Sequence, residues 1–135
     1  MSVQLYWHIH QLAFRLEKRA DEQLRSQTTI GFAQYKVLAA VGHNSLVKQN
    51  VVADLLHQTE ASISRQVHIL EKKQLLHIGT VMGNRRAREL VLTEAGEASL
   101  RDAERIIDEV QAQSMSMLSE NECRLLESLL ERIVQ

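Results

Sequence analysis

Three arginines gather in one short segment of a chain that is otherwise nearly neutral. Arg85, Arg86 and Arg88 follow Gly83 and Asn84, whereas the net charge of all 135 residues is −1. Glycine and asparagine tolerate left-handed backbone angles and are common in turns. Guanidinium groups on a projecting turn suit phosphate groups, and their binding releases counterions from a nucleic acid. The segment therefore predicts an anion-binding turn, with a solvated, charged hairpin turn as the alternative.

A second group of polar side chains lies along a predicted helix, residues 60–73. Ile63, Val67 and Leu70 recur at helical spacing, which predicts a buried stripe on one face. The opposite face carries Ala61, Ser62, Arg65, His68, Ile69 and Lys72. A DNA major groove accepts such a mixture, because small residues allow close approach and polar ones bond to base edges.

The residue types on this helix suggest particular base contacts. Arg65 is the best candidate for a bidentate contact to guanine, and Gln66 for one to adenine. The alternative is an ordinary amphipathic surface helix, which the residues of this segment alone do not exclude.

The elements that position these residues are mostly helical. Apolar periodicity predicts helices over 4–25, 31–43, 48–56, 60–73, 94–117 and 120–134. Thr59 and Thr93 are candidate N-caps, and Ser119 with Glu122 fits a capping box. Strand-like runs over 75–82 and 87–92 flank the turn and predict a β-hairpin. The fold class is therefore mainly α with a small β-hairpin wing, a winged helix-turn-helix.

Length and composition are those of one globular domain. The 135 residues are 44% apolar and 24% charged. No apolar run approaches the about 18 residues of a membrane span, and the first residues lack a signal-peptide pattern. A single cysteine, Cys123, excludes an internal disulfide, and the cytoplasm is the expected compartment.

The charge is divided along the chain. Residues 60–93 carry six Lys and Arg against three Asp and Glu, whereas residues 94–135 carry four against ten. A basic middle beside an acidic end indicates one anion-facing element and one solvated helical element.

No pattern of an enzyme is present in the sequence. A glycine-rich phosphate loop, a nucleophile elbow and a paired-carboxylate motif are all missing. His8 and His10 lie two residues apart and point to different helix faces, so they cannot hold one ion together. We expect no catalytic activity, no metal and no cofactor.

The segments VVADLLHQTEASISRQVHILEKKQLL and NRRARELVLTEAGEASL carry a resemblance to a known family. They resemble the MarR family of bacterial transcription regulators, and the resemblance extends over the whole chain. It implies a single domain, 1–135, with a winged helix-turn-helix over 31–93 between dimerisation helices in 1–30 and 94–135. The recognition helix would span about 60–73 and the wing about 75–92.

The resemblance also implies which residues contact DNA. Ser62, Ser64, Arg65 and Gln66 lie where family members contact bases and phosphates. Wings of the family commonly carry an Asp-x-Arg triplet that places its arginine in the minor groove, and Arg86 takes that place here. The full set of predicted DNA-binding residues is Ser62, Ser64, Arg65, Gln66, Lys72, Arg85, Arg86 and Arg88.

The first and last helices need a partner. An apolar stripe on the last helix is too large for a small winged domain to cover; it comprises Leu125, Leu126, Leu129, Leu130, Ile133 and Val134. A symmetric homodimer would bury it, and in the family these helices interlock around a two-fold axis. Two recognition helices about 10 base pairs apart predict an inverted-repeat operator in double-stranded DNA.

Family members also respond to small molecules. Members often bind small aromatic or phenolic anions between the dimer helices and the winged domain, and others sense oxidants through cysteine, or metal. The resemblance therefore implies a DNA-binding repressor that a small-molecule effector releases. Candidate pocket residues are Trp7, His10, Phe14, Phe32 and Tyr35. The alternatives are that these aromatic residues pack in the core or an interface, and that Cys123 is a small buried residue.

Three residues depart from the family pattern. Gln74 stands where glycine is common, Ile78 where many members have arginine, and Asn84 where an acid braces the wing arginine. These departures favour a second possibility, a winged-helix protein-interaction module that has lost DNA binding.

Overall fold

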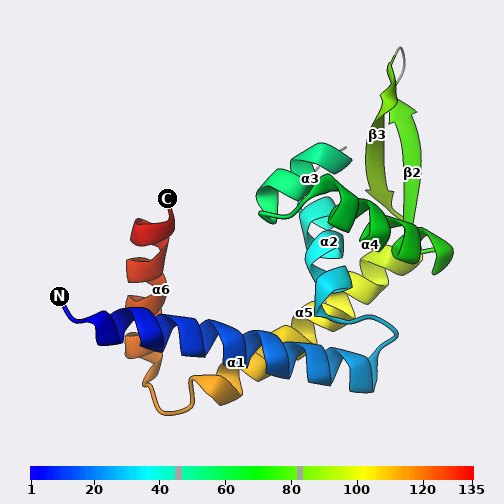
Figure 1. Ribbon diagram of the computed structural model, residues 1–135. Coiled ribbons are helices and arrows are strands. Elements are labelled where there is room, and N and C mark those ends of the chain that lie inside the picture. The colour runs from blue at the N-terminus through cyan, green and yellow to red at the C-terminus, as the bar shows by residue number, and fades with distance from the viewer. Residues whose placement is uncertain (45–46, 82–83) are drawn as a thin grey trace.

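Six helices and one small sheet form the part of the chain that the computed structural model describes, residues 1–44, 47–81 and 84–135, without the side chains of residues 80–88 (Figure 1). The helices are α1 (Val3–Gln27), α2 (Phe32–Gly42), α3 (Gln49–Leu55), α4 (Glu60–Lys72), α5 (Glu94–Ser114) and α6 (Glu120–Val134). The strands are β1 (Val47–Lys48), β2 (Leu76–Val81) and β3 (Asn84–Leu92). The predicted fold class, mainly α with a small β-hairpin, is confirmed.

The elements form a winged part and a helical arm (Figure 1). Helices α2, α3 and α4 and the hairpin gather at one end, and α1 and α5 run together away from them. Helix α6 stands near the N-terminal end of α1, and none of its residues is buried. Within the described ranges, we find no helix with the length and apolarity needed to cross a membrane.

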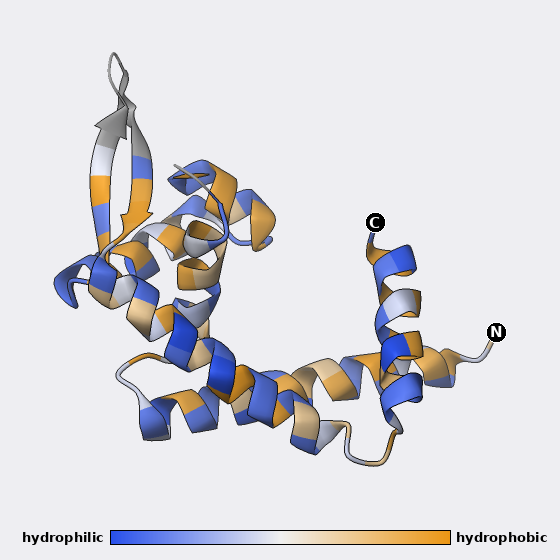
Figure 2. Cartoon of the chain, turned by 180° about the vertical axis from the view of Figure 1, so that it is seen from behind, coloured by the Kyte–Doolittle hydropathy of each residue, from blue (hydrophilic) through white to orange (hydrophobic). Residues whose placement is uncertain are grey.

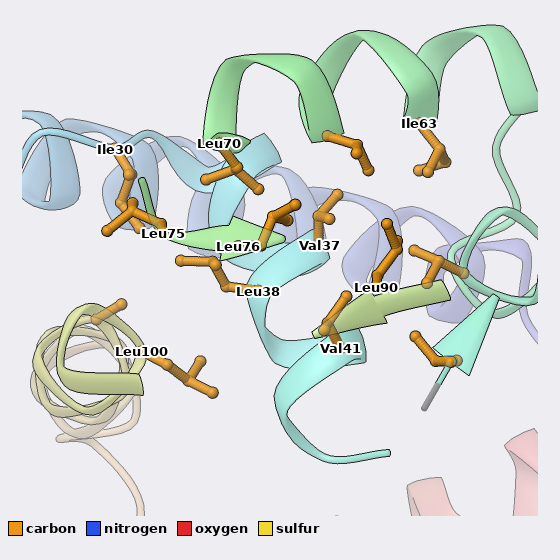
Figure 3. Packing of buried hydrophobic residues seen from close by; sticks show 14 of the residues in the cluster. Ile30, Val37, Leu38, Val41, Ile63, Leu70, Leu75, Leu76, Leu90 and Leu100 are labelled. Atoms are coloured by element: carbon orange, nitrogen blue, oxygen red, sulfur yellow. The ribbon is translucent and has the colours of Figure 1, made fainter. Parts of the chain in front are cut away.

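The core is centred on the winged part and extends to α1 through Leu24 and to α5 through Leu100 (Figure 3). Ile63, Val67 and Leu70 of α4 are fully buried, which confirms the stripe that the sequence predicts. They pack in one cluster with Val37, Leu38 and Val41 of α2, Leu76 of β2 and Leu90 of β3. This burial removes one face of α4 from water and leaves the opposite face outwards.

The sheet is antiparallel in the order β1-β3-β2. Val47 pairs with Leu90, and Leu76 pairs with Leu92. The helix predicted over 48–56 is observed as Gln49–Leu55, so the prediction was one residue too long at each end. At the first end, Lys48 belongs to β1 instead. The helix predicted over 94–117 ends at Ser114, so that prediction was three residues too long.

Side-chain caps fix where three helices begin. Thr59 Oγ1 accepts a hydrogen bond from the backbone N–H of Ser62 at 3.1 Å, and Thr93 caps α5 in the same way. Ser119 Oγ accepts from the N–H of Glu122 at 3.1 Å, and Glu122 Oε1 accepts from the N–H of Ser119 at 2.9 Å. The Ser119 N–H lowers the pKa of the Glu122 carboxyl, since it bonds to the charged form. All three predicted caps are confirmed.

Gln74 ends α4 with a left-handed backbone, φ 60°. The N–H of Leu75 bonds to the carbonyl of Leu70 at 3.0 Å, and the N–H of Gln74 to that of Glu71 at 2.9 Å. These two bonds form a Schellman motif, whose left-handed position is usually glycine. Gln74, which stands where glycine is common in the family, therefore adopts the left-handed conformation that a non-glycine residue rarely adopts. The reversal leads the chain directly into β2, where Thr93 Oγ1 bonds to the Gln74 carbonyl.

Asp21 of α1 supplies the cap that α2 lacks. Helix α2 begins after Gly31, which has no side chain, and Asp21 Oδ1 accepts from the N–H of Phe32 at 2.9 Å. Arg25 Nε donates to both Asp21 oxygens at 3.0 and 2.9 Å. A Cβ on Gly31 would lie 2.7 Å from Arg25 Nη2 and 2.8 Å from Asp21 Oδ1, so a larger residue would displace these two side chains from the cap. The Phe32 N–H, assisted by Arg25 and opposed by burial, lowers the pKa of the Asp21 carboxyl.

We expect Asp21→Ala to lower the free energy of unfolding by about 1 kcal/mol at pH 7, the usual effect of losing a cap. Because the folded pKa is depressed, this stabilisation is present above the unfolded pKa of about 3.9 and is lost as pH falls through the folded value. Urea unfolding at pH 7 and pH 3 measures the difference. Glu22→Ala, at the exposed neighbouring residue, is the control. An effect of equal size at both pH values would contradict the role of the carboxylate.

Candidate nucleic-acid interface

Helices α3 and α4 are joined by a tight turn. His57 in this turn has φ 53°, and the N–H of Gln58 bonds to the carbonyl of Ala53 at 3.0 Å. This left-handed residue ends α3 and lets α4 begin three residues later, after the Thr59 cap. The two helices with their turn and the following hairpin form a winged helix-turn-helix, as the sequence predicts.

The outward face of α4 is small and basic. Ala61, Arg65, His68 and Lys72 are exposed, opposite the buried row that seats the helix. Among the side chains that the structure describes, no carboxylate lies within 4.0 Å of the Arg65 or Lys72 cations. Their donors therefore face solvent and are available to an anion.

The remaining predicted residues of α4 lie on its flanks and are half-buried. Ser62 Oγ donates to Gln58 Oε1 at 3.0 Å. Gln66 Oε1 accepts from Gln34 Nε2 of α2 at 2.9 Å. Ser64 lies on the other flank. No local sequence pattern marks Gln34 as a neighbour of α4, because only the packing of α2 on α4 brings Gln34 and Gln66 together.

Two neighbouring lysines end α4 in different ways. Both are exposed, but the Lys73 ammonium donates to the backbone carbonyl of Thr29 in the connection between α1 and α2. Lys73 therefore holds the C-terminal end of α4 against the arm, and only Lys72 adds to the outward basic face.

The hairpin extends from the same end of the molecule as α4 (Figure 1). Strands β2 and β3 occupy the predicted wing region, and their backbones pair from Leu76 with Leu92 to Thr80 with Arg88. The predicted side chains of Arg85, Arg86 and Arg88, and that of Asn84, lie outside the described part of the structure. Ile78 is half-buried against the core cluster, which accounts for an apolar residue at this position.

The five aromatic and histidine residues predicted for an effector pocket fall into separate groups. Trp7 and His10 form an edge-to-face pair, with ring centroids 5.8 Å apart, on the exposed first turns of α1. Phe32 and Tyr35 lie on α2 with ring centroids 5.8 Å apart. Phe14 is 62% exposed.

A cavity of about 400 Å³ lies between α1, α2 and α5. Phe32 lines it, together with Lys36, Glu17 and apolar residues of α1 and α5. The Lys36 ammonium lies 5.4 Å from the centre of the Phe32 ring, a cation–π arrangement. The sequence alone did not indicate Lys36, because this residue lines the cavity only through the packing of α2 against α1 and α5. Nearby, burial and the charge of Glu104 raise the pKa of the Tyr35 phenol.

Hydrophobic residues recur along α1 and α6 (Figure 2), and many of their side chains are exposed. On α6, Leu125, Leu129 and Ile133 follow one another at four-residue spacing and are 59%, 41% and 73% exposed. Exposed residues of α1 include Val3, Leu5, Tyr6, Trp7, Ile9 and Phe14. A groove of about 890 Å³ separates α6 from α1 and α5, and the half-buried Cys123 lines it.

Solved structures share this architecture over nearly the whole chain. A MarR-family transcriptional regulator from Rhodococcus sp. RHA1 superposes with a TM-score of 0.88 at 19% identity, covering 98% of this chain and 94% of that one. A cysteine-to-serine variant of MarR from E. coli, complexed with operator DNA, gives 0.84 at 19% identity, covering 98% and 95%. The MepR–DNA complex from S. aureus gives 0.80 at 22% identity, covering 96% and 95%.

Sequence comparison gives shorter matches. No family model matches the chain. Two HTH-type transcriptional regulators of Cupriavidus pinatubonensis, TfdS and TdfR, are each 34% identical over 77 residues, or 57% of this chain. The chain spans about a quarter of the length of these curated relatives, since the match covers 24% of each. The likeness in structure is the more extensive one, and the chain has the winged helix-turn-helix fold of the MarR-family transcriptional regulators.

Proposed function

We propose that the chain is a sequence-specific DNA-binding transcription regulator of the MarR family, a homodimeric repressor that a small-molecule effector releases from DNA. The observation that carries the proposal is the orientation of α4. Its buried row turns Arg65, His68 and Lys72 outwards, and a basic hairpin extends from the same end of the molecule. Two proteins of the same fold have been crystallised with DNA, which supports this assignment.

In the proposed complex, α4 enters the major groove and the hairpin reaches the neighbouring minor groove. Arg65 is the candidate for bidentate hydrogen bonds to guanine, which distinguish bases, and Ser62, Ser64 and Lys72 are candidates for phosphate and base contacts. Arg86 is the candidate for the minor groove, whose negative potential attracts arginine, while Arg85 and Arg88 add phosphate contacts.

We expect Arg65→Ala and Arg86→Ala to weaken DNA binding in different ways. Loss of a bidentate contact removes about 1–3 kcal/mol of binding free energy from sites that carry the preferred base and leaves other sites unchanged. Arg65→Ala should therefore relax the sequence preference. Loss of a charge in the minor groove weakens binding to all sequences and lowers the salt slope by about 1. Site selection from random duplex DNA, followed by salt titration of the selected site, measures both quantities.

Lys18→Gln, an exposed charge change on α1, is the control for the loss of one positive charge. Equal, sequence-independent losses for the two arginine variants would contradict their assigned roles. If the unaltered protein enriches no sequence and shows no salt-dependent binding, the protein-interaction module is the better assignment.

The homodimer is supported by the apolar surface that one copy leaves uncovered. Leu125, Leu129 and Ile133 of α6 and residues on the first turns of α1 expose large apolar side chains. Contiguous exposed apolar surface on this scale marks an interaction site. A two-fold dimer through α1 and α6 would cover it and leave both outward faces of α4 free for an inverted repeat.

We expect Leu129→Glu to shift the protein from dimer to monomer, because it places a charge in the middle of the apolar row. Sedimentation equilibrium over a range of concentrations measures the dissociation constant, which should rise by at least about 100-fold for a buried, unpaired charge. Ser128→Glu adds the same charge beside the row and should leave the dimer intact. A monomeric parent protein, or a dimer unaffected by Leu129→Glu, would rule out this interface.

The effector site is best placed in the cavity between α1, α2 and α5. Phe32 offers an aromatic face and Lys36 a positive charge, which together suit a small aromatic acid. Both residues belong to α2, the helix on which α4 packs, so a ligand there would act on the seating of the recognition helix. Of the five residues predicted for an effector pocket, this site includes Phe32, and it also includes Lys36.

We expect 2-hydroxybenzoate, used as a probe, to weaken DNA binding by the parent protein about tenfold, a typical coupling between two sites. Lys36→Gln should abolish this response, because it removes the charge that pairs with the carboxylate. Lys18→Gln should respond like the parent. Calorimetric titration in the absence of DNA separates loss of ligand binding from loss of coupling, and unchanged ligand affinity in Lys36→Gln would exclude this cavity.

A further inference from the structure

The amide of Gln34 bridges the start of α2 and the recognition helix. Gln34 Oε1 accepts from the backbone N–H of Gly31 at 2.7 Å, and Gln34 Nε2 donates to Gln66 Oε1 at 2.9 Å. Both bonds are part-buried; the first lies within the start of α2, and the second joins α2 to α4, which pack together in the core.

The orientation of both amides follows from hydrogen-bond chemistry. A backbone N–H only donates, so the Gln34 atom facing Gly31 must be the oxygen. The other end of the Gln34 amide is then an NH₂ group, which also only donates. The Gln66 atom facing it must therefore be its oxygen, and the Gln66 NH₂ group is left on the other side.

This arrangement limits what Gln66 offers to a ligand. A bidentate contact to adenine uses both ends of a glutamine amide, the oxygen toward N6 and the nitrogen toward N7. In this structure the Gln66 oxygen accepts from Gln34 of α2, so the NH₂ group is the end of the Gln66 amide that is left for a ligand. Guanine, adenine and thymine each offer an acceptor in the major groove, whereas cytosine offers only its N4 donor.

We propose that Gln34 is a positioning residue that holds the Gln66 amide as an outward donor, so that the recognition helix excludes cytosine at one base of each half-site. This inference rests on the proposed function, because it assigns a base preference to a helix that binds DNA. Gln34 does not touch DNA in this scheme, and it sets specificity through the hydrogen bond to Gln66.

Gln34→Glu inverts the arrangement with almost no change of shape. One carboxylate oxygen keeps the bond from the Gly31 N–H, and the other faces Gln66 as an acceptor. The Gln66 amide must then turn over to donate, which places its oxygen outwards. The outward group becomes an acceptor, which suits the N4 amine of cytosine and the N6 amine of adenine.

The experiment is site selection from random duplex DNA with the full chain and with Gln34→Glu. We expect the parent to disfavour cytosine about tenfold at one position of each half-site, the scale of one hydrogen bond, and Gln34→Glu to remove or reverse that bias. Gln66→Ala should abolish the discrimination against cytosine, both alone and combined with Gln34→Glu.

Gln58→Glu is the matched control for charge. Gln58 accepts from Ser62 Oγ at the other end of α4, so a carboxylate there adds the same charge and leaves the Gln66 amide in place. We expect it to lower affinity without changing the base preference. Thermal unfolding of all variants checks that α2 and α4 remain seated.

A second readout needs no DNA. In the parent, the side-chain NH₂ group of Gln34 donates a hydrogen bond to Gln66. In Gln34→Glu, the side-chain NH₂ group of Gln66 should donate to the new carboxylate. Temperature coefficients of the side-chain amide protons, measured by NMR on isotope-labelled protein, distinguish the two arrangements. A parent that binds DNA with the same base preference as Gln34→Glu would overturn the inference alone. A parent that binds no DNA would overturn the proposed function and this inference together.

Discussion

The burial of Ile63, Val67 and Leu70 is the constraint on which the rest of the molecule depends. Three side chains on one stripe fix the rotation of α4 about its axis, because any other rotation would place apolar groups in water and Arg65 in the core. The position of the helix along that axis is fixed by the Thr59 cap at one end and the left-handed Gln74 at the other. The rotation and the axial position of α4 are therefore both set by contacts within the chain.

Much of this was predictable from local sequence. The α4 stripe, the Thr59 cap and the Ser119–Glu122 capping box depend on residues within one or two turns, where spacing alone determines the geometry. The strained turn at Gln74 also followed from a local pattern. The two-residue strand β1 did not, since two residues carry no periodicity and Val47 joins the sheet only by pairing with Leu90, far along the chain.

The candidate site was predictable only in part, for the same reason. The outward exposure of Arg65 and Lys72 follows from the helical period, but the contact between Gln34 and Gln66 spans 32 residues and depends on how two helices pack. Asp21 caps α2 from eleven residues upstream, across a change of direction that no local pattern encodes. Aromatic residues were grouped by type into one pocket, although Trp7 and Phe32 lie on different helices and only Phe32 lines the cavity.

The uneven charge of the chain complements this geometry. The acidic residues 94–135 form α5 and α6, which run away from the winged part, whereas the basic residues 60–93 form α4 and the hairpin at the opposite end. A polyanion would be repelled by the arm and attracted to the winged part, so the charge orients an approaching duplex without deciding its sequence. In the proposed complex, sequence preference would come from the few polar groups that packing holds in one position. Of these, the Gln66 amide is anchored by a part-buried hydrogen bond from Gln34 of another helix, which distinguishes it from the solvent-facing side chain of Arg65.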